Sequence, residues 1–320
     1  MKRTRKAEIL RAVEILRRGG LVAFPTETVY GLGADAHNAQ AVARIFEAKR
    51  RPPNHPVIVH MSDAGQMERF ARDIPSVAWR LARRFWPGPL TLILRRALDL
   101  PDAVTGGHDT VGLRVPAHSW ALALLKAFGG GVAAPSANPF GGISPTTAAH
   151  VMAGLGQAVD LVIDGGPCVV GLESTILDLS TDTPRLLRPG AITADTLANV
   201  LGIAIARRIS ASSPAPGSLP SHYAPKTALQ LADRPFPEWS QLPFPLAVMA
   251  FHPPPKGIAP RYWVMMPQIA SLYGRDLYAR LREIDRWGCR LILVERPPHT
   301  SEWEAVHDRL MRAAGLGHLL

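Results

Sequence analysis

Apolar positions along the chain recur first at helical and then at strand spacing. Ile9, Val13 and Leu16 predict a helix over 4–18, and Gly19-Gly20 supplies its stop signal. The apolar run 21–24 then predicts a buried strand that ends at Pro25. The same patterns predict helices around 42–46, within 64–85, and near 119–128, 145–155 and 193–201. They predict strands at 57–60, 90–94, 111–115, 132–134, 161–163 and 175–179.

This mixture indicates an α/β fold, but the short, closely spaced strands are not typical of a plain βαβ alternation. We therefore expect a twisted mixed sheet covered by helices over residues 1–207. Residues 208–227 are rich in serine and proline, and they predict an extended linker because proline fixes φ and lacks an amide donor.

The remainder, 228–320, alternates again and predicts a smaller C-terminal α/β domain with a parallel sheet. Strands are expected at 246–251, 261–265 and 291–294, and a helix at 269–287. Ser301 and Glu304 fit a capping box at the start of a final helix. The only distinctive cluster in residues 228–320 is a proline run, so we expect this domain to support the linker rather than to form a second catalytic site.

Composition places the chain among globular proteins: 320 residues, 47% hydrophobic and 19% charged. No apolar run approaches the roughly 20 residues that span a bilayer, and the N-terminus lacks an apolar signal core, so we expect a cytoplasmic protein. Cys168 and Cys289 lack metal-ligand spacing, which argues against a zinc site or a disulfide framework. The net charge of +10 favours anionic ligands, either nucleotides or nucleic acid.

Two polar segments follow buried strands or helices in the first half of the chain. If the chain stays extended after Pro25, Thr26 and Thr28 point to opposite sides, and one hydroxyl can face a ligand. A turn with capping hydroxyls is an equal alternative. The run Lys49-Arg50-Arg51 suits a phosphate, although a solvated helix end has the same pattern. His60 ends an apolar strand and can equally be a core histidine.

Three further clusters combine arginine, hydroxyls and glycine. Thr110, Gly112 and Arg114 share one face of a strand. Small residues over 134–146 let backbone amides approach a phosphate closely, and 173–175 and 185–190 add hydroxyls and arginines. The chain has no P-loop and no G-x-S-x-G nucleophile elbow. The inventory indicates a basic, hydroxyl-rich cavity for a phosphate-bearing small molecule.

In this order and spacing, these clusters and the linker motif Ser-His-Tyr-Ala-Pro (221–225) resemble the two-domain form of the threonylcarbamoyl-AMP synthase (YrdC-like) family. The resemblance runs from about 7 to 202, resumes at 218–225 and is loose over the C-terminal domain. It implies a nucleotidyltransferase that uses ATP, L-threonine and bicarbonate, with Mg²⁺ as cofactor. A threonine carbamate would attack the α-phosphorus of ATP and expel pyrophosphate. The product would pass to a downstream threonylcarbamoyl transferase that modifies tRNA.

The resemblance also implies residue roles, none of them a covalent nucleophile. The threonine-binding set comprises Thr28, His60, Arg114 and Ser174. The nucleotide-binding set comprises Lys49, Arg51, His55, Thr110, Ala134, Ser136, Asn138, Ser144, Arg188 and Tyr223. His55 departs from the family, which commonly has asparagine before this proline, so its ATP contact is in doubt. Tyr223 would reach over the nucleotide as part of a lid.

Two other functions compete with this hypothesis. The positive charge also suits a module that binds tRNA or double-stranded RNA without catalysis. A carbamoyltransferase-like domain that handles carbamoyl-adenylate is a third possibility, but such domains come in larger chains with additional modules.

Overall fold

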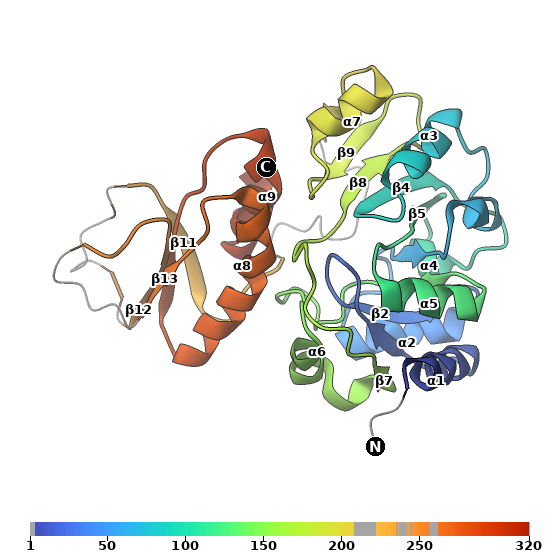
Figure 1. The fold of residues 1–320 in the computed structure, drawn as a ribbon, viewed down its shortest axis with the longest axis horizontal. Helices are drawn as coiled ribbons and strands as arrows, with labels where there is room; N and C mark the ends of the chain where they lie inside the picture. The colour runs from blue at the N-terminus through green and yellow to red at the C-terminus, as the bar shows by residue number, and fades with distance from the viewer. Residues whose placement is uncertain are drawn as a thin grey trace.

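The computed structural model describes residues 4–207, 222–234, 236, 242–243, 245–255 and 262–319, so most of the expected linker, 208–221, lies outside the described residues. Two α/β units lie side by side, one drawn from blue to yellow and the other in orange and red (Figure 1). Within the described ranges, no helix has both the length and the apolarity to cross a bilayer.

A mixed sheet of ten strands organises the first unit, in the order β10-β9-β8-β4-β5-β3-β6-β2-β1-β7. Parallel and antiparallel pairs alternate irregularly across it, which confirms the predicted mixed sheet. Its strands are β1 (Val22–Phe24), β2 (Gly31–Asp35), β3 (Ile58–His60), β4 (Leu90–Arg95), β5 (Thr110–Arg114), β6 (Val132–Ala133), β7 (Leu161–Val162), β8 (Thr175–Asp178), β9 (Arg185–Arg188) and β10 (Ala206–Arg207).

Helices form close to the predicted ranges and cover most of this sheet. They are α1 (Arg5–Arg17), α2 (Ala39–Lys49), α3 (Ser76–Phe85), α4 (Asp102–Thr105), α5 (Ser119–Phe128), α6 (Ala148–Leu155) and α7 (Ala194–Leu201), with short 3₁₀ turns η1 (Ala64–Arg69) and η2 (Gly156–Ala158). Three large apolar clusters pack these helices against the strands. A fourth cluster on the central strands holds only Ile58, Ile93, Ile176 and Leu187. The candidate site lies beside Ile58 of this small cluster.

The second unit contains four parallel strands in the order β11-β14-β12-β13, which confirms the predicted parallel sheet, although strand β11 was not predicted. Its elements are β11 (Ala228–Ala232), β12 (Leu246–Ala250), β13 (Trp263–Met265), β14 (Leu291–Glu295), α8 (Ala270–Ile284), α9 (Glu304–Ala313) and the 3₁₀ turns η5 (Asp285–Trp287), η6 (Ser301–Trp303) and η7 (Gly317–Leu319). The predicted capping box is wrong. Ser301 already lies inside a 3₁₀ turn whose N-cap is Thr300, and α9 has Trp303 as its N-cap; neither N-cap residue makes a side-chain cap hydrogen bond within the described part of the chain.

Helices α8 and α9 face the first unit (Figure 1). The loop at Gly171 lies directly against α8: a Cβ on this glycine, whose φ is +79°, would lie 2.4 Å from the Cα of Arg275. Arg282 of α8 donates a hydrogen bond to the carbonyl of Ile143. The two units therefore share a packed junction, and this junction borders the candidate site.

Candidate functional site

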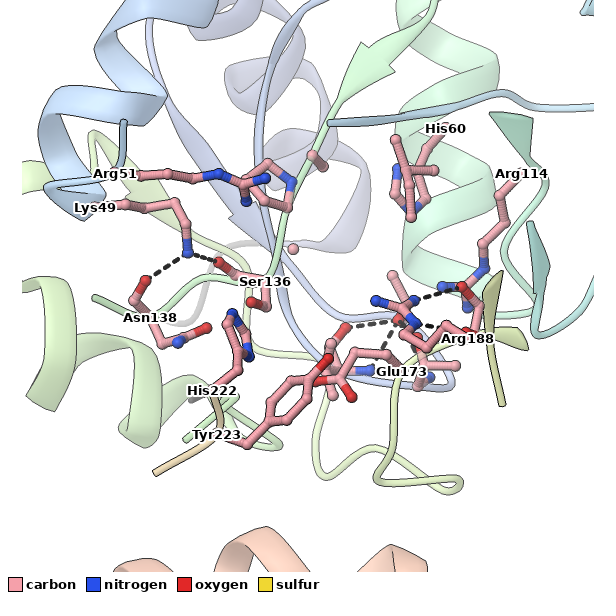
Figure 2. A pocket seen from close by; sticks show the side chains of 18 of the residues that line it. Lys49, Arg51, His60, Arg114, Ser136, Asn138, Glu173, Arg188, His222 and Tyr223 are labelled. Carbon is pink, nitrogen blue, oxygen red and sulfur yellow. Dashed lines mark hydrogen bonds between the residues drawn. The ribbon is translucent and has the colours of Figure 1, made fainter. Parts of the chain in front are cut away.

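One cavity gathers residues from strand ends, loops and the linker of the first unit. Of the fourteen site residues that the sequence predicts, eleven line it; the others are His55, Thr110 and Ser144. Figure 2 shows Lys49 and Arg51 on one side and His60 and Arg114 on the other. The lining residues are Thr26, Thr28, Val29, Gly31, Lys49, Arg51, Ile58, His60, Arg114, Ala134, Pro135, Ser136, Asn138, Phe140, Glu173, Ser174, Arg188, His222 and Tyr223.

His60 and Arg114 are register partners because β3 and β5 run parallel. Glu27 fixes Arg114: its Oε1 lies 2.6 Å from an Nη of Arg114, and its Oε2 accepts from the amide of Ala117 at 2.9 Å. Burial and the nearby Arg114 lower the pKa of His60 to about 3, so its ring is neutral at pH 7. The Nδ1 atom of His60 has no hydrogen-bond partner among the residues that the structure describes. This side of the cavity therefore offers a fixed guanidinium and a neutral imidazole.

Thr26 and Thr28 lie together, contrary to the extended-chain prediction. Their hydroxyl oxygens are 2.8 Å apart, and Thr26 Oγ1 donates to the carbonyl of Val29 at 2.6 Å. The amide of Val29 donates back to Thr26 Oγ1 at 3.2 Å. The chain therefore turns at Thr26 instead of remaining extended, and both threonines line the cavity.

Ser174 directly precedes β8 and is held by side chains on β4 and β9, the two strands that flank β8. Its hydroxyl pairs with that of Thr91 at 2.8 Å, and an Nη of Arg188 donates to it at 3.1 Å. Arg188 Nε also donates to the Ser174 carbonyl at 3.0 Å. Arg188, predicted to bind nucleotide, therefore also fixes the position of Ser174.

Lys49 and Arg51 bring buried positive charge to the opposite side. The ammonium of Lys49 donates to the carbonyls of Ser136 and Asn138 (Figure 2), and Arg51 donates to the carbonyl of Pro56. Within the described part of the chain, neither forms an ion pair with a carboxylate. Burial and the charge of Arg51 lower the pKa of Lys49 well below its usual value, and burial lowers the pKa of Arg51 to about 10. An anion bound here would offset this cost.

His222 and Tyr223 lie near the C-terminal end of the linker and line the cavity. Tyr223 has a left-handed φ of 61°, and its ring stacks on Tyr278 with centroids 5.8 Å apart. The ring of His222 contacts Phe140 and Tyr223. The unfilled volume is about 50 Å³. That volume holds a few water molecules, whereas pockets for drug-sized ligands measure about 300–1,000 Å³. As it stands, the cavity is therefore too small for a ligand of that size.

Glu173 is the centre of a buried network that sequence reasoning did not include among the site residues. Its carboxylate accepts from the hydroxyls of Ser144 and Tyr278 and from Arg309 Nε, the last two at 2.9 Å. Burial alone would raise the pKa of Glu173, but Arg309, Arg188 and Ser144 outweigh it and hold it at about 2. Glu173 is therefore an ionised carboxylate in the cavity wall.

Three predicted residues lie outside the lining. Ser144 lies behind Glu173 and supports it. His55 lies beside the ring of Phe140, with centroids 5.5 Å apart. Thr110 begins β5, at the opposite end of the strand from Arg114. Sequence reasoning missed Glu27, His222 and Arg309 as site residues. Glu27 lies between Thr26 and Thr28, and His222 lies within the linker motif 221–225, so both could have been included. No local sequence signal marks Arg309.

Comparisons with known proteins identify relatives of both units of the chain. Residues 14–190 match the Sua5, YciO and YrdC family model, described as telomere recombination. Residues 192–315 match the model described as threonylcarbamoyl-AMP synthase, C-terminal domain. The threonylcarbamoyl-AMP synthase of Pyrococcus abyssi is 39% identical over 318 residues, which cover 95% of this chain and 93% of that relative.

The chain belongs to the threonylcarbamoyl-AMP synthase family. The family member from Bacillus subtilis is also 39% identical, over 98% of this chain and 94% of its own length. The crystal structure of P. abyssi Sua5 complexed with L-threonine aligns with a TM-score of 0.88 and 36% identity, and the match covers 99% of this chain and 96% of that one. The family resemblance of the motifs and the expected fold are both confirmed.

Proposed function

We propose that this chain is a threonylcarbamoyl-AMP synthase. The amine of L-threonine combines with carbon dioxide from bicarbonate to give a carbamate and water. A carbamate oxygen then attacks the α-phosphorus of ATP. The bond between the α-phosphorus and the bridging oxygen breaks, and pyrophosphate leaves with the electron pair.

The observation that carries this proposal is the concentration of unpartnered polar atoms around one cavity. Eight buried side-chain atoms in the described residues have no hydrogen-bond partner, and five of them belong to cavity residues. Buried polar groups are normally satisfied, so this set indicates a missing polar ligand. The five atoms are Arg51 Nε, His60 Nδ1, Asn138 Oδ1, His222 Nδ1 and Tyr223 Oη. An RNA duplex could not reach atoms this deeply buried, which disfavours the binding-module alternative.

The threonine end of this proposal consists of Thr28, His60, Arg114 and Ser174. Glu27 uses part of the Arg114 guanidinium and leaves other N–H donors for the threonine carboxylate. Neutral His60 can accept or donate one hydrogen bond without adding charge. This arrangement orients the amine for carbamate formation by positioning alone.

The nucleotide end consists of Lys49, Arg51, Ser136, Asn138 and the backbone near Ala134, with Arg188 beside Ser174. Lys49 and Arg51 lack carboxylate partners in the described residues, so phosphate groups would neutralise them. Their charge stabilises the pyrophosphate that leaves, because negative charge grows on it in the transition state.

Magnesium is expected to bind through the phosphates of ATP. The two carboxylates near the cavity, Glu27 and Glu173, are each paired with an arginine. No cluster of three or more potential metal ligands occurs in the part of the chain that the structure describes. Mg²⁺ commonly keeps several waters and binds substrate phosphates, and it would add further charge neutralisation there.

The linker, assigned to 208–227, acts in this proposal as a lid through His222 and Tyr223. Closure would exclude water from the mixed anhydride, which hydrolyses readily. The product would then pass to a separate threonylcarbamoyl transferase that modifies tRNA.

The proposal is tested by pyrophosphate release from ATP with purified protein, with threonine, bicarbonate or magnesium omitted in turn. We expect release only when all three are present. Release that does not depend on threonine would instead indicate a generic nucleotide hydrolase, and no release together with salt-sensitive RNA binding would favour the RNA-binding module.

A further inference from the structure

Arg309 of α9 reaches out of the C-terminal unit to the loop that carries Ser174. Its side chain is fully buried, and its Nε lies 2.9 Å from Glu173 Oε2. A second nitrogen lies 3.5 Å from the Glu173 carbonyl, and the third donates to the carbonyl of Pro189 at 3.0 Å. The Arg309 guanidinium thus contacts Glu173 and Pro189, which adjoin Ser174 and Arg188 in the sequence.

The loop at 173–174 is consequently held from both sides. Arg188 bonds the carbonyl and hydroxyl of Ser174 from the first unit. Arg309 bonds the carboxylate and carbonyl of Glu173 from the second unit. Tyr278 of α8 adds a hydrogen bond to the same carboxylate. The position of Ser174 therefore depends on groups that the C-terminal unit supplies.

The same guanidinium also contacts the lid. Its central carbon lies 5.2 Å from the ring centroid of Tyr223, and Tyr278 stacks on the same ring. Asp308 orients Arg309 from its own helix at 2.6 Å, and Asp308 is in turn bonded by Arg312. A planar guanidinium can make these contacts simultaneously, whereas a lysine ammonium has neither the fork nor the flat face.

We propose that Arg309 is a positioning residue for the synthase reaction. It fixes the Glu173–Ser174 loop and Tyr223 relative to each other, so that the C-terminal unit completes the active site only when the lid is closed. This inference rests on the proposed function. A buried ion pair adds little net stability compared with apolar residues of similar volume, so its stability alone gives no reason for a charged residue at this position.

The test separates positioning from folding with a double-mutant cycle. Arg309→Met leaves the buried carboxylate of Glu173 without its ion-pair partner, so both stability and activity should fall. In Arg309→Met/Glu173→Gln no unpaired carboxylate remains, and stability should recover. Activity should stay low, because a misplacement of about 1 Å in a reacting group costs on the order of 100-fold. Arg309→Lys should recover stability better than turnover.

Arg282→Met is the matched control, because Arg282 also crosses the junction but contacts the Ile143 carbonyl instead of Glu173. We expect it to lower the melting temperature, because the Ile143 carbonyl loses its hydrogen bond, while kcat for threonine-dependent pyrophosphate release stays close to that of the wild type. Equal loss of kcat in Arg282→Met and Arg309→Met would mean that general junction packing is responsible, which overturns the positioning role.

Two further outcomes distinguish the inference from the proposed function. If the wild-type chain releases pyrophosphate and the double variant regains activity along with stability, Arg309 serves folding only and the inference is wrong. If the wild-type chain shows no threonine-dependent release, the proposed function fails first, and the positioning role fails with it.

Discussion

Replacing Arg114 tests the proposed threonine site, but a single substitution of this buried residue would change folding stability as well as threonine binding. Arg114 and Glu27 form an ion pair at 2.6 Å, and their side chains are 4% and 5% exposed. Removing one partner of such a pair costs about 3–5 kcal/mol of folding free energy, because the other charge stays buried. The better perturbation is Arg114→Met/Glu27→Gln, since removing both charges of a buried pair is often nearly neutral for stability.

The double variant should bind threonine weakly and ATP normally. Charge-assisted hydrogen bonds to a carboxylate contribute about 1.5–3 kcal/mol. At 1.4 kcal/mol per tenfold change, this corresponds to a rise of about 10- to 150-fold in the threonine Kd. Calorimetric titration with threonine and with a non-hydrolysable ATP analogue measures both constants, and urea unfolding checks the fold.

Glu27→Gln alone is the matched control. It should lower stability by about 3–5 kcal/mol, because Arg114 stays buried without its carboxylate. It retains Arg114, and glutamine can still accept the Ala117 amide, so the folded protein should bind threonine within a few-fold of the wild type. An unchanged threonine Kd in the double variant would refute the assignment of Arg114 to the carboxylate. An equal loss of ATP affinity would show that the whole cavity had changed.

Three further predictions follow from buried groups of the cavity. His60 and His222 have folded-state pKa values of about 3 against about 6.5 when unfolded, so the stability present above pH 6.5 is lost as pH falls toward 3. Between pH 7 and 5, each histidine should lower the free energy of unfolding by about 2 kcal/mol, at 1.36 kcal/mol per pKa unit. Urea unfolding at both pH values should give a smaller fall in this free energy for His222→Gln than for the wild type. An equal fall would contradict the prediction. Lys49→Met should weaken binding of a non-hydrolysable ATP analogue, because phosphate would offset the cost of burying the Lys49 ammonium. Calorimetric titration measures this loss, and an unchanged Kd would contradict the assignment of Lys49 to the nucleotide. Tyr223→Ala should open the lid, so that water hydrolyses the product and less threonylcarbamoyl-AMP is recovered per pyrophosphate released. An unchanged yield of threonylcarbamoyl-AMP would argue against a lid.

Local sequence patterns predicted the elements that bury one continuous apolar face. The helix α1 and strand β1 are examples. Strand β2 escaped prediction because Gly31 and Gly33 lower strand propensity, yet a Cβ on Gly33 would lie 2.6 Å from a methyl carbon of Val132. Tight packing requires glycine at this position, and this glycine is what obscures the strand in the sequence pattern.

The residues of the site were predictable where a motif lies at a strand end. Which of these residues become neighbours in space was not predictable. His60 and Arg114 become neighbours only through the parallel pairing of β3 and β5, which periodicity does not reveal. Arg309 lies 136 residues from Glu173 in sequence. Charged positions on an amphipathic helix are normally assigned to solvent. In α9, however, Asp308, Arg309 and Arg312 are buried, so this rule does not hold there and the contribution of the C-terminal unit was not predicted.

The central claim is that this cavity joins threonine, bicarbonate and AMP. Mass spectrometry of a reaction with ¹³C-labelled bicarbonate, ATP and threonine tests it most directly. We predict one labelled carbon in an adduct that contains both threonine and AMP, formed in step with pyrophosphate. Pyrophosphate release with AMP as the only adenylate product, even when the reaction is quenched early, would contradict the account.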